Sequence, residues 1–132
     1  MEHKLFWILY FKFWMKTENK ILEMSFDFSL QIIQLYKVLV ENKEFVLSKQ
    51  LLRSGTSIGA NIEEGMAAQS RKDFISKMSI ASKEARETRY WLRLLDKSKL
   101  VELDYSVYLN SAEHIVNILT KIVKTSIETN PQ

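Results

Sequence analysis

Apolar residues recur along most of the chain at alternating steps of four and three residues, the spacing of one face of an α-helix. Ser70 stands where an N-cap residue belongs, and Asp73 suits the positive end of the helix dipole. The sequence therefore predicts a helix over residues 71–98. Its apolar stripe consists of Phe74, Met78, Ala81, Ala85, Thr88, Leu92 and Leu95.

The same spacing predicts three more helices. One covers residues 25–40, and its stripe consists of Phe28, Ile32, Leu35 and Leu39. Another follows Asp104, its predicted cap, with the stripe Tyr105, Leu109, Ala112, Val116, Leu119 and Val123. Short connections near residues 41–44, 68–70 and 98–104 make consecutive helices antiparallel. We therefore predict an all-α, antiparallel up-down four-helix bundle.

The remaining helix, over residues 44–67, contains two glycines. Gly55 and Gly59 are poor helix formers, but the apolar spacing from Leu51 through Ile58 to Ile62 continues across them. A phosphate-binding loop would need a lysine at position 60, where Ala60 stands. We therefore predict one continuous helix, with the two glycines at a close contact with another helix.

The first 23 residues do not share this pattern. Leu5–Phe11 is a continuous apolar run, too short for a membrane span of about 20 residues and without the cleavage site of a signal peptide. The segment is either a helical extension that packs on the bundle or a partner, or sequence upstream of a translation start at Met24. We favour the second interpretation, and divide the chain into an N-terminal extension (1–23) and a bundle domain (24–132).

Composition leaves little material for catalysis. Cys is absent, which excludes thiolate sites and fits a reducing cytoplasm, and His3 and His114 are the two histidines. Glu84 and Glu87 lie one turn apart, but neither has the histidine three residues on that di-iron bundles use. We expect ion pairs with Arg53 or Arg86 instead, and no enzyme activity, catalytic residue, metal or cofactor.

Positive charge is concentrated in one segment. Residues 71–99 hold nine Lys/Arg against four Asp/Glu, a net charge of +5, whereas the whole chain carries +3. A basic stripe runs along one helix face beside Tyr90 and Trp91, and consists of Arg86, Arg89, Arg93 and Lys97. Arginine grips phosphate and aromatics stack on bases, so the stripe is a candidate nucleic-acid site. The alternatives are a solvated helix face or ion pairing with carboxylates such as Glu84 and Glu87.

Two stretches of sequence closely resemble a known family. They are LSKQLLRSGTSIGANIEE, from Leu47 to Glu64, and KDFISKMSIASKEARETRYWLRLL, from Lys72 to Leu95. Both resemble the four-helix-bundle proteins encoded in intervening sequences of bacterial 23S rRNA genes. The resemblance covers about residues 26–127 and leaves residues 1–23 outside.

The resemblance implies a bundle that assembles into a homopentameric ring. Relatives include the accessory protein of diversity-generating retroelements, a basic pentamer that works with a reverse transcriptase and nucleic acid. The family has no accepted catalytic residues, and its shared positions serve packing or assembly as readily as binding. These shared positions are Arg53, Ser54, Gly55, Asn61, Glu63, Lys77, Glu84, Glu87 and Trp91. We assign Gly59 to helix packing as well.

We therefore expect a non-enzymatic oligomer that acts as a nucleic-acid-binding or adaptor protein. The alternative is a self-assembling protein–protein interaction module that binds no nucleic acid. The expected partners are further copies of the chain, as a pentamer, and RNA or DNA, without a membrane or a small-molecule substrate. Large side chains outside the apolar stripes support assembly, because large apolar patches mark interfaces. They are Phe45, Ile75, Ile80, Tyr90, Trp91 and Leu94.

Overall fold

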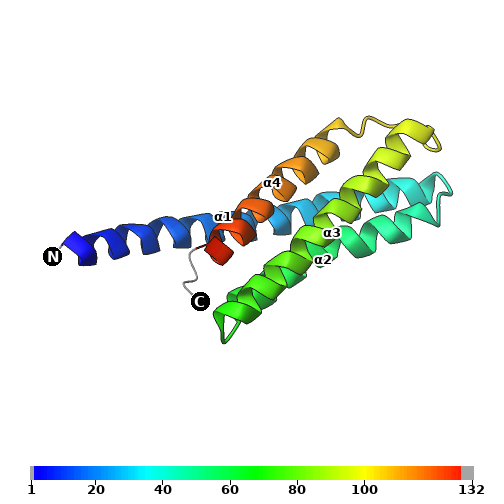
Figure 1. Cartoon of the computed structure of the whole chain (residues 1–132). Coiled ribbons are helices and arrows are strands. Elements are labelled where there is room, and N and C mark those ends of the chain that lie inside the picture. Colours follow the sequence, from blue (N-terminus) through cyan, green and yellow to red (C-terminus); the bar gives the residue numbers. More distant parts are fainter. Residues whose placement is uncertain (1, 129–132) are drawn as a thin grey trace.

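The computed structural model describes residues 2–128; within residues 2–20 it describes the side chains at positions 9, 12, 15, 16, 19 and 20. This range forms four helices: α1 (Glu2–Glu41), α2 (Leu47–Met66), α3 (Arg71–Ser98) and α4 (Ser106–Glu128). Figure 1 shows consecutive helices running in opposite directions, with α4 returning beside α3. Helix α1 contacts both α2 and α4, which closes the bundle. The predicted all-α four-helix fold is confirmed.

The predicted apolar stripes form the core. All seven stripe positions of α3 and all four of α1 are buried. Helix α3 has the predicted bounds, and Ser70 Oγ accepts a hydrogen bond from the Asp73 backbone nitrogen at 3.0 Å. Of the stripe predicted for α4, Ala112, Val116 and Leu119 are buried, Leu109 and Val123 are partly buried, and Tyr105 is buried just before the helix begins. The helix also buries Ile115 and Ile122, because it packs against both α3 and α1.

Helix α2 begins later than predicted, because an acidic side chain precedes and caps it, and α4 begins at Ser106, after the predicted cap Asp104. The Glu44 carboxylate accepts hydrogen bonds from the backbone nitrogens of Leu47 at 2.8 Å and Ser48 at 2.7 Å, so α2 starts after it rather than at it. Asp104 Oδ1 accepts from the backbone nitrogen of Ser106 at 3.0 Å and from its hydroxyl at 2.6 Å. These bonds lower the pKa of Asp104.

The predicted start of the first helix, at residue 25, is wrong. Helix α1 is continuous from Glu2, because the polar segment 17–20 contains neither Gly nor Pro and can be helical. Ile21 is 0% exposed, so the bundle core begins before Met24. Figure 1 shows that the N-terminal part of α1 projects beyond the other three helices. The side chains of the run Leu5–Phe11 lie outside the described set, except for Leu9, which is exposed.

Candidate functional site

Helix α3 carries charged residues on two sides. On the side that contacts α2, they belong to an intramolecular cluster of ion pairs. Arg53 of α2 pairs with Glu84 of α3 (Nη1 to Oε2, 3.2 Å) and with Glu87. These carboxylates raise the pKa of Arg53, with the Glu87 hydrogen bond as the largest cause. The predicted ion pair of these glutamates is therefore with Arg53 rather than Arg86.

Trp91 belongs to this cluster and not to the basic stripe. Its Nε1 donates a hydrogen bond to Glu87 Oε2 at 3.0 Å, and the side chain is half-buried. The bond from Trp91, followed by the one from Arg53, lowers the pKa of Glu87. Tyr90 contacts the Trp91 ring edge-on at a centroid distance of 5.1 Å and is exposed. Of the two aromatics expected beside the stripe, Tyr90 alone is placed to flank it.

The α2 side of α3 is also closely packed. Thr88 Oγ1 lies 2.8 Å from Ser54 Oγ, and both residues are fully buried. A Cβ added at Gly65 would come within 3.0 Å of Met78 Cε and 3.2 Å of Lys77 Cβ. The contact at Gly65 could not be predicted from the sequence, because it depends on the register of α2 against α3.

The two glycines expected at a close helix contact differ. A Cβ at Gly55 would lie 2.8 Å from Ile32 Cγ2 of α1, closer than real Cβ contacts allow. At Gly59 the nearest atoms, in Ser25 and Ser29, would be 3.5 Å away, an ordinary contact distance. Both glycines therefore face α1, and the closer approach is at Gly55.

The remaining shared positions have local roles in the single chain. Asn61 Nδ2 donates to the backbone oxygen of Ser57, one turn earlier, at 2.8 Å. Glu63 is exposed. Lys77 pairs with Glu64 across the α2–α3 contact at 3.4 Å. None of these three lies on the α4 side of α3, where the basic stripe is found.

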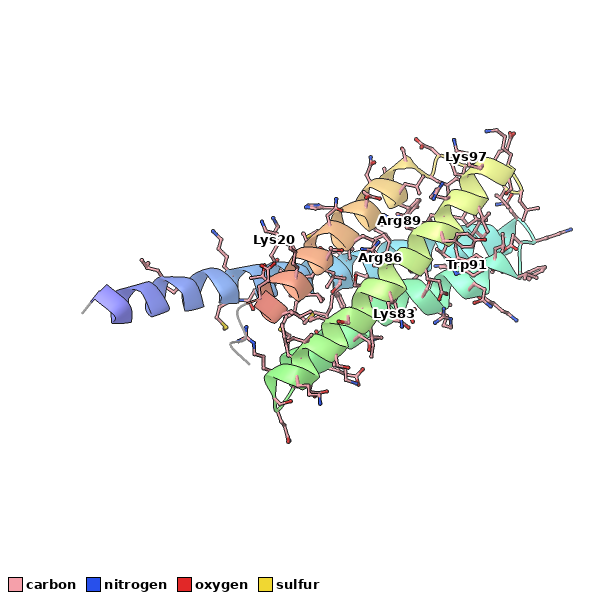
Figure 2. All side chains as sticks on the ribbon, viewed as in Figure 1. Lys20, Lys83, Arg86, Arg89, Trp91 and Lys97 are labelled. Atoms are coloured by element: carbon pink, nitrogen blue, oxygen red, sulfur yellow. The ribbon has the colours of Figure 1, made fainter. Side chains whose placement is uncertain are left out.

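The basic stripe follows the side of α3 that faces α4. Arg86 Nη2 donates to Thr120 Oγ1 at 3.0 Å, and Arg89 Nη1 pairs with Glu113 Oε2 at 2.9 Å. Figure 2 shows Arg86 and Arg89 toward α4, with Trp91 on the other side of α3. Arg93 and Lys97 continue the stripe and are exposed, and neither occurs in an ion pair within the described residues.

Additional exposed lysines enlarge this positive surface. Lys83 lies one turn before Arg86 on α3, and Lys124 lies one turn after Thr120 on α4. Lys121 of α4 is exposed as well. Sequence spacing within α3 could not reveal the contribution of α4, because that depends on which α4 residues lie beside Arg86. The surface is therefore built by two helices, with Glu113 as the acidic group that pairs within it.

A second surface feature was not predicted from the sequence. Phe26, Leu30 and Ile33 of α1 recur at steps of four and three, outside the buried stripe, and are 62%, 48% and 37% exposed. The spacing itself was visible in the sequence, but only the observed orientation of α1 shows that this face lies outside the core. Of the predicted outward residues, Phe45, Ile80 and Tyr90 are exposed, whereas Ile75, Trp91 and Leu94 are partly buried.

The described residues contain no group of three His, Asp or Glu side chains placed to hold a metal ion. His114 is exposed on α4. None of the described helices combines the length and apolar character needed to cross a membrane.

Comparisons with known proteins agree with the resemblance found in the sequence. The family model of the 23S rRNA-intervening sequence protein matches residues 17–121. A crystal structure from Bacteroides thetaiotaomicron, described as a protein with unknown function from the S23 ribosomal protein family, is 50% identical with a TM-score of 0.78. The match covers 82% of this chain and 98% of that chain. No curated protein matches. The chain belongs to the family of 23S rRNA-intervening sequence proteins.

Proposed function

We propose that the protein is a non-enzymatic, self-associating helical bundle that binds nucleic acid through the basic side of α3. The observation that carries the proposal is that the cations of the basic stripe differ in their intramolecular partners. Arg86 and Arg89 are held by Thr120 and Glu113, whereas Arg93 and Lys97 are exposed and in no described ion pair. Cations without an intramolecular partner can contact phosphate without first breaking a bond.

The expected contacts are to the phosphate backbone. Arginine and lysine at successive helical turns offer charge along a line, and no base-reading motif accompanies them. Tyr90, exposed beside Arg86 and Arg93 on α3, is the one described aromatic that could stack on an unpaired base there. Binding should therefore depend weakly on sequence and strongly on salt.

Self-association supports this function by repeating the basic side. The exposed stripe of Phe26, Leu30 and Ile33 is a contiguous apolar surface of the kind that marks interfaces. The family resemblance favours a homopentamer. Several copies of a weak phosphate-binding face on one particle would add through effective concentration.

Fluorescence anisotropy with a structured RNA and a duplex DNA, each titrated at several salt concentrations, tests the proposal. We expect affinities that differ little between sequences and fall steeply as salt increases. The absence of binding to both nucleic acids at low salt would refute nucleic-acid recognition.

The second candidate is an assembly module that binds no nucleic acid. The apolar stripe of α1 favours it, because assembly does not require the basic stripe. Light scattering tests assembly with a triple variant in which Phe26, Leu30 and Ile33 become Ser. A matched triple variant replaces exposed apolar residues elsewhere: Val46, Val107 and Ile127. Loss of assembly in the first variant but not in the second would support the apolar stripe of α1 as the assembly interface. Equal assembly of the two variants would contradict that assignment.

A further inference from the structure

The N-terminal part of α1 lies outside the bundle. Core packing begins at Ile21, which is fully buried, while the described side chains before it, among them Leu9 and Met15, are exposed. Figure 1 shows no other helix running alongside the first turns of α1. The family model begins at residue 17, so most of this segment is additional to the family fold.

The segment is unusual for a helix that no other part of its own chain covers. Positions 5–15 are apolar or aromatic except for Lys12, and the backbone over these positions is helical. Successive helical positions are separated by about 100°, so eleven of them place apolar residue types on every side of the helix. A helix that is apolar all round is found in a protein core or in lipid.

Exposed lysines occur at regular intervals from within this run to the start of the bundle. Lys12, Lys16 and Lys20 are spaced by four residues and are all exposed. Four-residue spacing places neighbouring residues on the same side of a helix, so the three ammonium groups form one positive row. The row ends where the bundle begins, at Ile21.

We propose that residues 5–20 of α1 bind the surface of an anionic membrane, with the apolar run inserted in one leaflet and the lysine row at the headgroups. A groove on a protein, or the same segment of a second copy, would cover one side of the helix, whereas a leaflet covers every side except the one that carries the lysine row. Lysine near the apolar boundary can extend its ammonium group to the headgroups. The positive row selects acidic lipids over neutral ones.

This mode of binding requires no membrane span. Eleven helical residues extend about 16 Å, roughly half the thickness of the hydrocarbon core. The described helices include none that could cross a membrane, and a surface anchor needs none. The sequence predicts no membrane partner, because the apolar run is too short to span a bilayer, and insertion at the surface differs from such a span.

Co-sedimentation of the full chain with vesicles tests the proposal. One set contains phosphatidylcholine alone, and the other contains phosphatidylcholine mixed with phosphatidylserine. We expect sedimentation with the mixed vesicles and much weaker sedimentation with the neutral ones. If the protein sediments with neither set of vesicles, or equally with both, the proposal is overturned.

Two variants separate the contributions of charge and apolar insertion. Replacing Lys12, Lys16 and Lys20 by Glu should reduce partitioning into the mixed vesicles by about a hundredfold or more. A control with the same change of charge replaces Lys37, Lys49 and Lys72, which are exposed on the bundle, and should bind as the unaltered chain does. The double variant L9E/M15E should lose binding to both vesicle types, because both side chains are exposed on the inserted segment. Equal loss in the control and the lysine-row variant would contradict the assignment.

Discussion

Helix α3 contacts α2 on one side and α4 on the other, and polar groups on the two sides are used differently. Toward α2, Glu84 and Glu87 are engaged by Arg53, and Thr88 meets Ser54 in the core. Toward α4, the basic stripe makes two described side-chain contacts across the helices, to Thr120 and Glu113. On the first side the charged groups pair across the helices, and on the second Arg93 and Lys97 occur in no described ion pair. The polar residues of one helix therefore make different contacts according to the neighbouring helix.

Close packing of α2 should produce the largest effect on stability. Gly55→Ala places a Cβ against Ile32, whose branched side chain has little freedom to move, and should cost about 1–3 kcal/mol. Gly59→Ala is the matched control, since its Cβ meets ordinary contacts and alanine favours helix; it should be neutral or stabilise by up to about 1 kcal/mol. Urea unfolding of both variants measures the difference, and equal stability would show that α2 is not crowded at Gly55.

Two threonines compare the sides directly. Thr88→Val removes a buried hydroxyl that lies 2.8 Å from Ser54 Oγ, and should cost about 1–2 kcal/mol. Thr120→Val removes an exposed hydroxyl that accepts from Arg86, and should change stability by less than about 0.5 kcal/mol. If thermal unfolding finds the larger loss for Thr120→Val, the α4 side is the more tightly held of the two.

The Glu87 cluster should make stability depend on pH. Hydrogen bonds from Trp91 and Arg53 lower the pKa of the Glu87 carboxyl group below its usual value of 4.5. The folded state therefore holds fewer protons than the unfolded state near that pH. The contribution is therefore complete above about pH 4.5 and is lost as pH falls through the lowered pKa. Because the group is partly exposed, we expect less than about 1 kcal/mol. Unfolding of Glu87→Gln at several pH values should show a shallower acid dependence than that of Glu113→Gln, its control.

The free end of the basic stripe should contribute least to stability. Arg93→Ala with Lys97→Ala removes two exposed cations that occur in no described ion pair, so the free energy of unfolding should change by less than about 0.5 kcal/mol. Denaturant unfolding of the double variant checks this. A loss of several times that size would mean that these side chains are structural in the assembled protein.

Features set by local sequence could be predicted, and features set by register between helices could not. The bounds of α3 follow from its heptad spacing and the Ser70 cap, both of which act within a few residues. The pairing of Glu87 with Arg53 rather than Arg86 depends on how α2 lies against α3. The contact of Arg89 with Glu113 depends in the same way on α4, which approaches α3 from the opposite side.

The start of α1 was missed for a different reason. The polar residues from Thr17 to Lys20 resemble the end of an element, although each is compatible with a helix. Ile21 continues the apolar stripe before Met24. A single apolar residue does not by itself predict that the core extends this far, because its packing beside Phe28 and Ile32 is visible only in the structure. Structure was needed to show that the core extends to Ile21.

Anisotropy titrations of the double variant R93A/K97A across salt concentrations test whether the α4 side of α3 binds nucleic acid. A control variant with the same loss of charge, K37A/K49A, removes exposed lysines of α1 and α2 away from the stripe. We expect R93A/K97A to bind nucleic acid more weakly and with a shallower salt dependence, while the affinity of the control and the assembled mass are unchanged. Unaltered affinity and salt dependence in an intact R93A/K97A assembly would contradict it.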